Sequence, residues 1–227
     1  NVEGIEHIFK QWFSADTFIK VCPIQAYPLL AEEKILVADA VRSRQQEFST
    51  GRWLARQGLQ YFGLPSVSIG IGTLRNPLWP ESIMGSITHD GEYCAVVLMR
   101  KHSQSELGIG IDLVALSQRT GKIDGLESMI SSHSKELDVV SQLNLDLDPA
   151  LLLFSIKESV IKALSFYLDD FIDMRLIEIS YTNKLVISLA GSLLKAEFFA
   201  AKTHGCLLTA VRVFQIDEKD NHYKRNC

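Results

Sequence analysis

One short segment restricts the fold of this chain more than any other: residues 107–114, Leu-Gly-Ile-Gly-Ile-Asp-Leu-Val, form an apolar run with a single ionisable side chain, Asp112. Its length and composition are typical of a buried β-strand. A carboxylate in such a strand needs a partner, because burying an unpaired charge is costly. Asp112 could cap a turn, pair with an arginine, or bind a hard cation such as Mg²⁺ together with substrate phosphates. The segment alone leaves all three open.

A helix is predicted from Pro149 to about Tyr167, since proline is well suited to the first helical turn. At about 100° per residue, its apolar side chains share one face. These are Leu153, Ile156, Val160, Leu164 and Tyr167.

Three charged residues of the same helix stand out. Glu158 and Lys162 share the opposite face at a spacing of four, which is most simply a surface ion pair. Lys157 lies close to the apolar face, so its ammonium group either extends to solvent or meets an anion. An anion approaching this helix is therefore one prediction.

Residues 42–79 contain five arginines and one glutamate, although the whole chain has a formal net charge of −4. The overall charge argues against a general nucleic-acid binder. Because arginine matches phosphate geometry, the local excess suits a phosphate-rich small molecule or an acidic protein. A solvated helix face explains it equally well.

His89 follows Gly-Ser-Ile-Thr, so the hydroxyl of Thr88 and the imidazole could both donate to a phosphate. A structural role, with hydroxyls capping a turn, is the alternative.

The pattern along the chain predicts an α+β protein with two similar halves, residues 1–106 and 107–227, joined near 100–106. Further expected elements are a helix over 31–62 ended at 63–65, a loop over 75–80, a turn at 90–91, strands over 93–99, 175–180, 185–189 and 207–214, and helices around 134–143 and 192–200.

With 227 residues, 47% of them hydrophobic, the chain can bury one large core or two small ones. No apolar run is long enough to span a bilayer and the first residues do not resemble a secretion signal, so we expect a cytoplasmic protein without membrane contact. The four cysteines are scattered, which predicts free thiols rather than zinc ligands.

Four ordered blocks resemble one family, the surfactin-type 4′-phosphopantetheinyl transferases, and in particular their enterobactin-synthase-associated branch. They are Arg44-Gln-Gln-Glu-Phe-Ser-Thr-Gly-Arg-Trp-Leu-Ala55, Arg75-Asn-Pro-Leu-Trp-Pro80 with Gly85-Ser-Ile-Thr-His89, Gly110-Ile-Asp112, and Phe154-Ser-Ile-Lys-Glu-Ser-Val-Ile-Lys162.

The resemblance implies two pseudo-symmetric α+β halves with coenzyme A in the cleft between them. The implied activity is Mg²⁺-dependent transfer of the 4′-phosphopantetheine group of coenzyme A to a serine of an apo acyl or peptidyl carrier protein, with release of 3′,5′-ADP. Positioning and charge neutralisation dominate such chemistry. A monomeric enzyme is expected.

By the same resemblance, Asp112 and Glu158 hold Mg²⁺, and Lys162 neutralises the pyrophosphate. Glu158 or a water at the metal is the base. The implied coenzyme contacts are Arg44, Arg52, Arg75, Thr88, His89, Lys157 and Lys162.

Two positions depart from the family pattern. Val114 stands where relatives often have a second acid, which removes one metal ligand, and Asn76 stands where a lysine is common beside the proline. A non-catalytic relative that binds coenzyme A or a carrier is therefore an alternative. A nucleotide-dependent phosphotransferase is a weaker one, because no glycine-rich phosphate loop is present.

Overall fold

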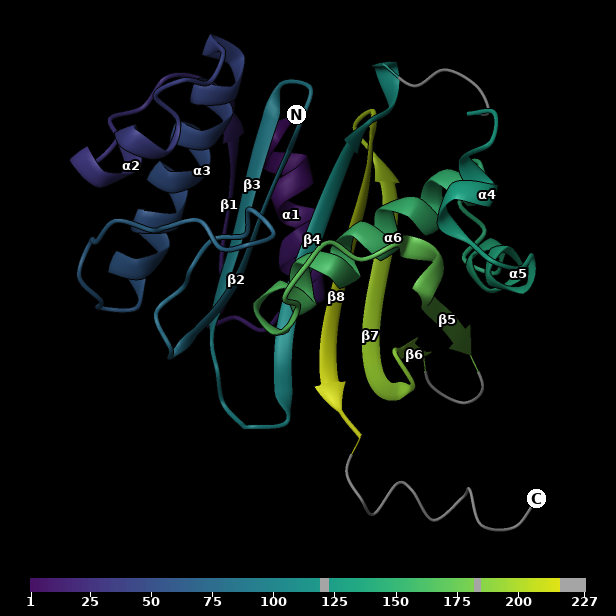
Figure 1. The fold of residues 1–227 in the computed structure, drawn as a ribbon. Coiled ribbons are helices and arrows are strands. Elements are labelled where there is room, and N and C mark those ends of the chain that lie inside the picture. The colour runs from purple at the N-terminus through teal and green to yellow at the C-terminus, as the bar shows by residue number, and fades with distance from the viewer. Residues whose placement is uncertain (119–122, 182–184, 217–227) are drawn as a thin grey trace.

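The computed structural model describes residues 1–118, 123–181 and 185–216. These residues form an α+β fold with two antiparallel sheets side by side (Figure 1). Among them, no helix combines the length and hydropathy that crossing a membrane requires.

The smaller sheet contains β1, β3 and β2, in that order. The helix α3 covers its outer face, and Leu54, Leu59 and Val96 lie in the core between them. The elements of this part are α1 (Val2–Trp12), β1 (Phe18–Pro23), α2 (Ala31–Leu36), α3 (Arg42–Tyr61), β2 (Ile83–Asp90) and β3 (Tyr93–Arg100).

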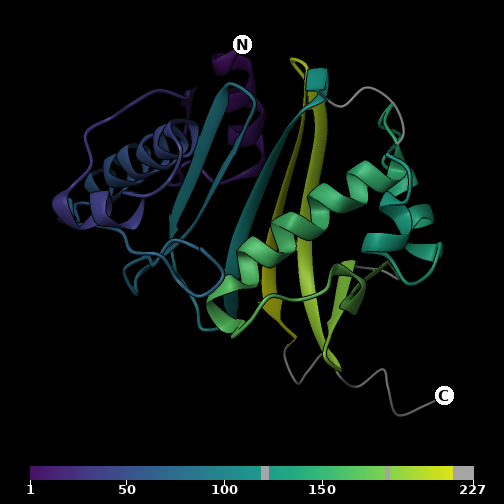
Figure 2. The same cartoon turned by 45° about the horizontal axis from the view of Figure 1, so that its top comes forward.

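The larger sheet has the order β4-β8-β7-β6-β5, and α6 crosses one of its faces (Figure 2). Leu153, Ile156 and Val160 of α6 are fully buried against this sheet. The elements are β4 (Glu106–Ala115), η1 (Leu116–Gln118), α4 (Leu126–Ile130), α5 (Lys135–Ser141), α6 (Pro149–Leu164), η2 (Ser165–Tyr167), η3 (Met174–Leu176), β5 (Ile177–Tyr181), β6 (Leu185–Leu189), β7 (Ser192–Thr203) and β8 (Cys206–Gln215).

Side chains of β2 join the two sheets by binding backbone amides of β4. Ser86 Oγ accepts from Ile111 N at 3.0 Å, and Thr88 Oγ1 accepts from Leu113 N at 3.0 Å. Asp90 Oδ2 accepts from the next amide on the same side, that of Ala115, at 2.8 Å. The two strands therefore run in the same direction along a seam that side chains hold together.

Two glycines of β4 let α6 approach the strand closely. A Cβ at Gly110 would lie 1.7 Å from the carbonyl oxygen of Ser159, and one at Gly108 would lie 1.8 Å from that of Ala163. No side chain fits in such a gap. The glycines on either side of Ile109 thus bring the helix against the strand that carries Asp112.

The helix α1 contributes to a hydrophobic cluster shared by both sheets. Ile5 and Phe9 lie in it with Val97 of β3, Ile111 of β4 and Leu208 of β8. The chain crosses between the sheets at residues 101–105, where the sequence predicts the join. The division into halves 1–106 and 107–227 stays a prediction.

Most of the expected elements are present. The loop over 75–80, the hairpin turn at Gly91, the helix that starts at Pro149 and the strands β3, β5, β6 and β8 are confirmed. The helix expected over 31–62 is divided into α2 and α3, and the short helix α4 was not expected. Cys22, Cys94 and Cys206 are free thiols, as expected, whereas Cys227 lies outside the described residues.

The short helix expected over 192–200 is wrong, because these residues belong to the strand β7. Lys195, Ala196 and Glu197 suit a helix by intrinsic preference. However, β7 pairs with β6 along one edge and with β8 along the other. Such pairing on both edges overrides local preference.

Candidate active site

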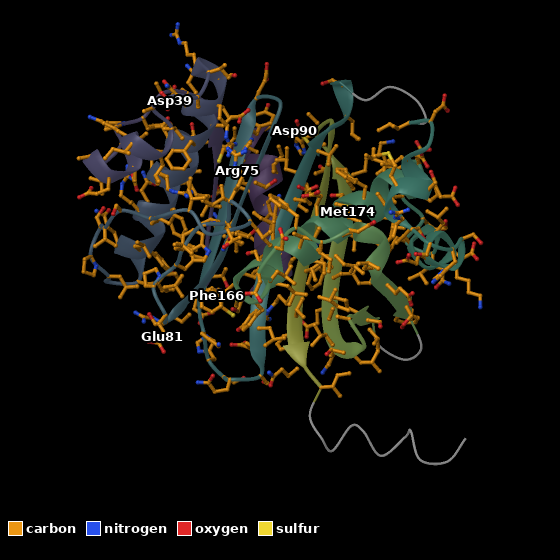
Figure 3. The ribbon with its side chains drawn as sticks, in the orientation of Figure 1. Asp39, Arg75, Glu81, Asp90, Phe166 and Met174 are labelled. Carbon is orange, nitrogen blue, oxygen red and sulfur yellow. The ribbon has the colours of Figure 1, made fainter. Side chains whose placement is uncertain are left out.

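A cleft of about 1150 Å³ follows the seam between β2 and β4. Its lining comes from the loop over 74–81, both seam strands, the second half of α6 and the segment that follows α6. Figure 3 labels five lining residues from these regions: Arg75, Glu81, Asp90, Phe166 and Met174. Six of the residues predicted from the sequence also line it: Arg75, Thr88, His89, Asp112, Glu158 and Lys162.

Asp112 and Lys162 form an ion pair in this cleft. Lys162 Nζ lies 2.9 Å from Asp112 Oδ1 and also donates to Ile111 O at 3.0 Å and to Thr88 Oγ1 at 3.2 Å. Asp112 is 7% exposed, and its other oxygen, Oδ2, accepts from Ser155 Oγ at 2.8 Å. The strand acid therefore does have the partners that its burial requires, and none of those named is an arginine.

Glu158 is half-buried and lies near this ion pair. Burial raises the pKa of the Glu158 carboxyl, the charge of Lys162 lowers it, and the charge of Asp112 raises it. No described residue donates a hydrogen bond to its carboxylate. Glu158 and Lys162 are therefore not the simple surface ion pair of an ordinary helix, because both face a cleft that also contains Asp112.

The two carboxylates suit a divalent cation only if other ligands join them. Asp112 and Glu158 supply hard oxygen donors at the same end of the cleft. Within the described residues, no group of three or more histidine, cysteine, aspartate or glutamate side chains could hold a metal. Val114 lines the cleft with an apolar, 2% exposed side chain. The residues thus fit Mg²⁺ that takes its remaining ligands from substrate oxygens and water.

His89, Arg44 and Glu47 form a polar cluster at the edge of the cleft. Arg44 donates to His89 Nε2 at 2.9 Å, and Glu47 Oε2 lies 3.2 Å from Arg44 and 3.5 Å from His89 Nδ1. Burial lowers the pKa of His89, Glu47 raises it, and the cations Arg44 and Lys162 lower it further. His89 is therefore neutral at pH 7, with Nε2 as the acceptor.

Arg75 is exposed and occupies a tight turn of the loop over 72–76. Its φ of 61° is in the left-handed region, and its amide donates to Gly72 O at 2.9 Å. The side chain of Arg75 lines the cleft beside that of Asn76. A cation is thus available on the loop side of the cleft even without the lysine common in relatives.

Arg52, which the resemblance places at the coenzyme, does not line the cleft. Its guanidinium donates to the carbonyl oxygens of Ile69 at 2.8 Å and Gly70 at 3.1 Å, and it lies 4.4 Å from the centre of the Phe48 ring. The side chain is 4% exposed, and burial lowers its pKa to about 10. In this structure Arg52 secures the chain at residues 69–70.

The arginine-rich stretch is likewise not one cationic surface. Arg56 forms a buried ion pair with Glu33 and donates to Pro28 O at 2.7 Å. Arg52 and Arg56 thus use their charges inside the protein. Of the five arginines, Arg42, Arg44 and Arg75 remain outside the core; Arg75 lines the cleft, and Arg44 reaches its edge through His89.

Lys157 does not line the cleft. Its ammonium group is fully buried and donates to Glu136 Oε1 at 3.0 Å, Ile130 O at 2.6 Å and Met174 O at 3.0 Å. The anion that its position predicted is Glu136 of α5, which the sequence analysis did not identify. The contact of Lys157 with coenzyme A that the resemblance implies stays a prediction.

Two other features were missed or misplaced. Tyr167, expected on the buried face, is 46% exposed, because the helix gives way to η2 at Ser165. The hydroxyls of Ser155, Ser159 and Thr209 form a buried network behind Asp112. A signal for two of them exists in the sequence, because Ser155 and Thr209 are small polar residues within apolar stretches.

Two family descriptions match separate parts of the chain. Residues 31–99 match "4'-phosphopantetheinyl transferase N-terminal domain", and residues 108–219 match "4'-phosphopantetheinyl transferase superfamily". The two matches meet near the crossing between the sheets, and they contain every cleft residue predicted above. The class defined by the fold and cleft is thus the phosphopantetheinyl transferases.

Several curated proteins are similar to this chain. "Enterobactin synthase component D" of Escherichia coli O157:H7 is 31% identical over 149 residues, which cover 65% of this chain and 68% of that protein. The Salmonella typhi protein of the same name is 36% identical over 126 residues (56% and 50%), and "4'-phosphopantetheinyl transferase Svp" of Streptomyces mobaraensis is 35% identical over 138 residues (60% and 54%).

The chain belongs to the 4′-phosphopantetheinyl transferase superfamily, in its enterobactin-type branch. It spans about half the length of the last two relatives.

Proposed function

We propose that this protein transfers the 4′-phosphopantetheine group of coenzyme A to a serine of an apo carrier protein, releasing 3′,5′-ADP. One observation carries the proposal: Asp112, Glu158 and Lys162 meet in a large cleft. Two acids and one cation suit a bound pyrophosphate with its metal. Membership of a transferase family supports the same activity.

Asp112 and Glu158 would hold Mg²⁺ in this site. When bound, the ion would neutralise the pyrophosphate of the coenzyme and favour departure of the leaving group. Because the chain itself supplies two carboxylates, we expect the metal to bind more tightly with coenzyme than without it.

The transfer needs one proton acceptor and a cation for the phosphates. The carrier serine oxygen forms a bond to the β-phosphorus, and the bond from that phosphorus to the oxygen of the 3′,5′-ADP leaving group breaks. Glu158, or a water at the metal site, would accept the serine proton. Lys162 Nζ, now 2.9 Å from Asp112, provides positive charge for the phosphate oxygens.

The edge with His89 suits the adenosine end of the coenzyme. Arg44 and Arg75 are the two arginines of the original stretch near the cleft that are not committed to buried partners. Together with Thr88 and His89 they would bind the 3′-phosphate and adenine. The phosphate would then replace Glu47 as the anion beside Arg44 and His89.

The partner is an acyl or peptidyl carrier protein. Phe166 and Phe171 line the cleft but are 77% and 74% exposed, so they give its mouth an apolar rim. Exposed apolar side chains next to a catalytic cleft suit a protein substrate.

The double substitution Phe166→Ser with Phe171→Ser should raise the KM for carrier, measured at saturating coenzyme, and leave the KM for coenzyme unchanged.

The direct test is incubation of the protein with coenzyme A, Mg²⁺ and a panel of apo carriers from fatty acid, polyketide, siderophore and other peptide pathways. Mass spectrometry should detect one added phosphopantetheine on at least one carrier, and the relatives named for enterobactin synthase make a siderophore carrier the first choice. Coenzyme binding without transfer to any carrier would instead support a non-catalytic relative, the alternative that Val114 suggests. The proposal includes a cytoplasmic, monomeric enzyme, which fractionation and light scattering would test.

A further inference from the structure

Three buried hydroxyl groups connect α6 and β8 directly behind Asp112. Ser155 Oγ lies 2.8 Å from Asp112 Oδ2 and 2.8 Å from Thr209 Oγ1, and Ser159 Oγ lies 2.9 Å from the same Thr209 atom. All three hydroxyl-bearing residues are fully buried. Since none of the three lines the cleft, they cannot contact a ligand there.

The direction of the hydrogen bond between Ser155 and Asp112 follows from the number of protons. An ionised carboxylate can only accept, so Ser155 must donate its single hydroxyl proton to Asp112. Ser155 Oγ can then act only as an acceptor toward Thr209 Oγ1, 2.8 Å away. The hydroxyl proton of Thr209 has a second acceptor on the same residue, the backbone oxygen of Ser155 at 3.1 Å, and Ser159 Oγ lies 2.9 Å from Thr209 Oγ1. Thr209 on β8 therefore contacts Ser155 at two atoms, and Ser155 holds Asp112.

These hydrogen bonds determine which oxygen of Asp112 faces the cleft. Oδ2 is held inside the protein by Ser155, whereas Oδ1 carries the contacts with Lys162 at 2.9 Å and Thr88 at 3.4 Å. The close approach of α6 at Gly110 makes the arrangement possible, because a Cβ there would collide with Ser159 O. Rotation of the carboxylate would break the bond to Ser155.

We infer that Ser155 and Thr209 are positioning residues of the proposed transferase, which hold the Asp112 carboxylate so that Oδ1 is presented to the divalent cation. The inference rests on the proposed function, since it needs Asp112 to be a metal ligand. Hydrogen-bonded partners of metal ligands typically contribute about 10- to 100-fold to metal affinity.

The test measures metal binding and does not rely on turnover alone. Mn²⁺, detected by electron paramagnetic resonance with and without coenzyme A, replaces Mg²⁺ as the probe. Thr209→Val removes the hydroxyl and keeps the shape, and it should weaken Mn²⁺ binding by about 10-fold. Thr209→Ser keeps the hydroxyl and should bind Mn²⁺ as the wild type does. Ser155→Ala should have the larger effect.

Thr50→Val is the matched control. Thr50 is fully buried in α3, and its hydroxyl binds Gln25 N at 3.1 Å and Gln25 O at 2.7 Å, far in sequence from every cleft acid. It should lose stability without losing affinity for Mn²⁺. The substitution thus separates the general effect of deleting a buried hydroxyl from an effect on Asp112.

The outcomes separate the inference from the proposed function. Equal Mn²⁺ affinity in wild type, Thr209→Val and Ser155→Ala would overturn the inference while the metal site stood. Equal loss in Thr209→Val and Thr209→Ser would also overturn it, since the hydroxyl would then not be responsible. A wild type that binds no Mn²⁺ with coenzyme A would remove the metal site itself, and the inference with it.

Discussion

At the scale of single residues, the cleft brings together charges that would be unfavourable without a ligand. Glu158 has no hydrogen-bond donor among the described residues, and Asp112 lies close enough to raise its pKa. Functional sites often contain charged groups without a stabilising partner, because the ligand supplies that partner when it binds. Residues of this kind contribute to activity and not to stability.

Glu158→Gln should therefore lower turnover by about 100-fold or more, as expected for loss of a general base. Its stability should equal or exceed that of the wild type. The raised pKa means that the neutral carboxyl is favoured in the folded protein, so above this pKa the ionised Glu158 costs stability, and neutral Gln avoids that cost. Thermal unfolding at pH 7 without metal, beside a carrier-loading assay, tests both parts. Unchanged turnover would remove Glu158 from the site.

His89 should make stability sensitive to mild acid. Its folded-state pKa is lowered below 6.5 by burial and by the cations Arg44 and Lys162, against the opposing charges of Glu47 and Asp90. The stability contributed by neutral His89 is thus present above pH 6.5 and is lost as the pH falls through the lowered pKa. Melting curves from pH 8 to 5 should show a steeper loss for wild type than for His89→Gln. His7→Gln, at an exposed position, is the control, and parallel curves for wild type and His89→Gln would contradict the expectation.

At the scale of elements, the charged side chains of α6 lie in two different environments. Glu158 and Lys162 face the cleft, whereas Lys157 is buried beside Glu136 and ties α6 to α5 and to the end of α4. Glu136 also accepts from Ser131 Oγ at 2.7 Å and from Ile179 N at 2.9 Å. Residues 130–136 and 174–179 are therefore anchored through one buried ion pair.

Lys157→Met should accordingly act on stability, with a loss of about 3–5 kcal/mol in the free energy of unfolding, because it leaves Glu136 buried without its cation. Urea unfolding measures the loss. Lys202→Met is the matched control, since Lys202 pairs with Asp146 at the surface and should contribute less than about 1 kcal/mol. A variant with normal stability but weakened coenzyme binding would restore the role that the sequence resemblance implies for Lys157.

At the scale of the whole molecule, the cleft follows a seam at which β2 and β4 are joined by hydrogen bonds to side chains and not by hydrogen bonds between the two backbones. Ser86, Thr88 and Asp90 accept hydrogen bonds from every second amide along β4. Thr88 also contacts Lys162 and Asp112, so the seam and the charged end of the cleft share a residue. The relative position of the sheets thus sets the geometry of the site.

Ser86→Ala should loosen this seam. It removes the acceptor of the Ile111 amide, and an unpaired buried amide costs about 1–3 kcal/mol. Hydrogen exchange at Ile111 should become faster than in the wild type, and the KM for coenzyme A should rise. Ser68→Ala, at an exposed position, should change neither. Unaltered exchange at Ile111 would mean that the seam does not depend on Ser86.

Sequence patterns alone predicted much of this protein. The apolar run around Asp112, the helix after Pro149 and the turn at Gly91 are local features, because chain geometry and hydrophobic spacing express themselves over a few residues. The family resemblance, and not a local pattern, placed Asp112, Glu158, Lys162 and His89 at the coenzyme site; all four line the cleft, and their roles stay predictions.

Only the tertiary structure decided which charged side chains face the cleft and which are paired with partners inside the protein. Arg52, Arg56 and Lys157 carry the same charge as Lys162, but their partners lie 17 to 28 residues away, and no local pattern identifies them. The strand β7 was decided by pairing on both of its edges, and the position of the acids by two glycines that let α6 approach β4. Long-range contacts of this kind select one partner among many of equal chemistry, and that choice exists only in the folded chain.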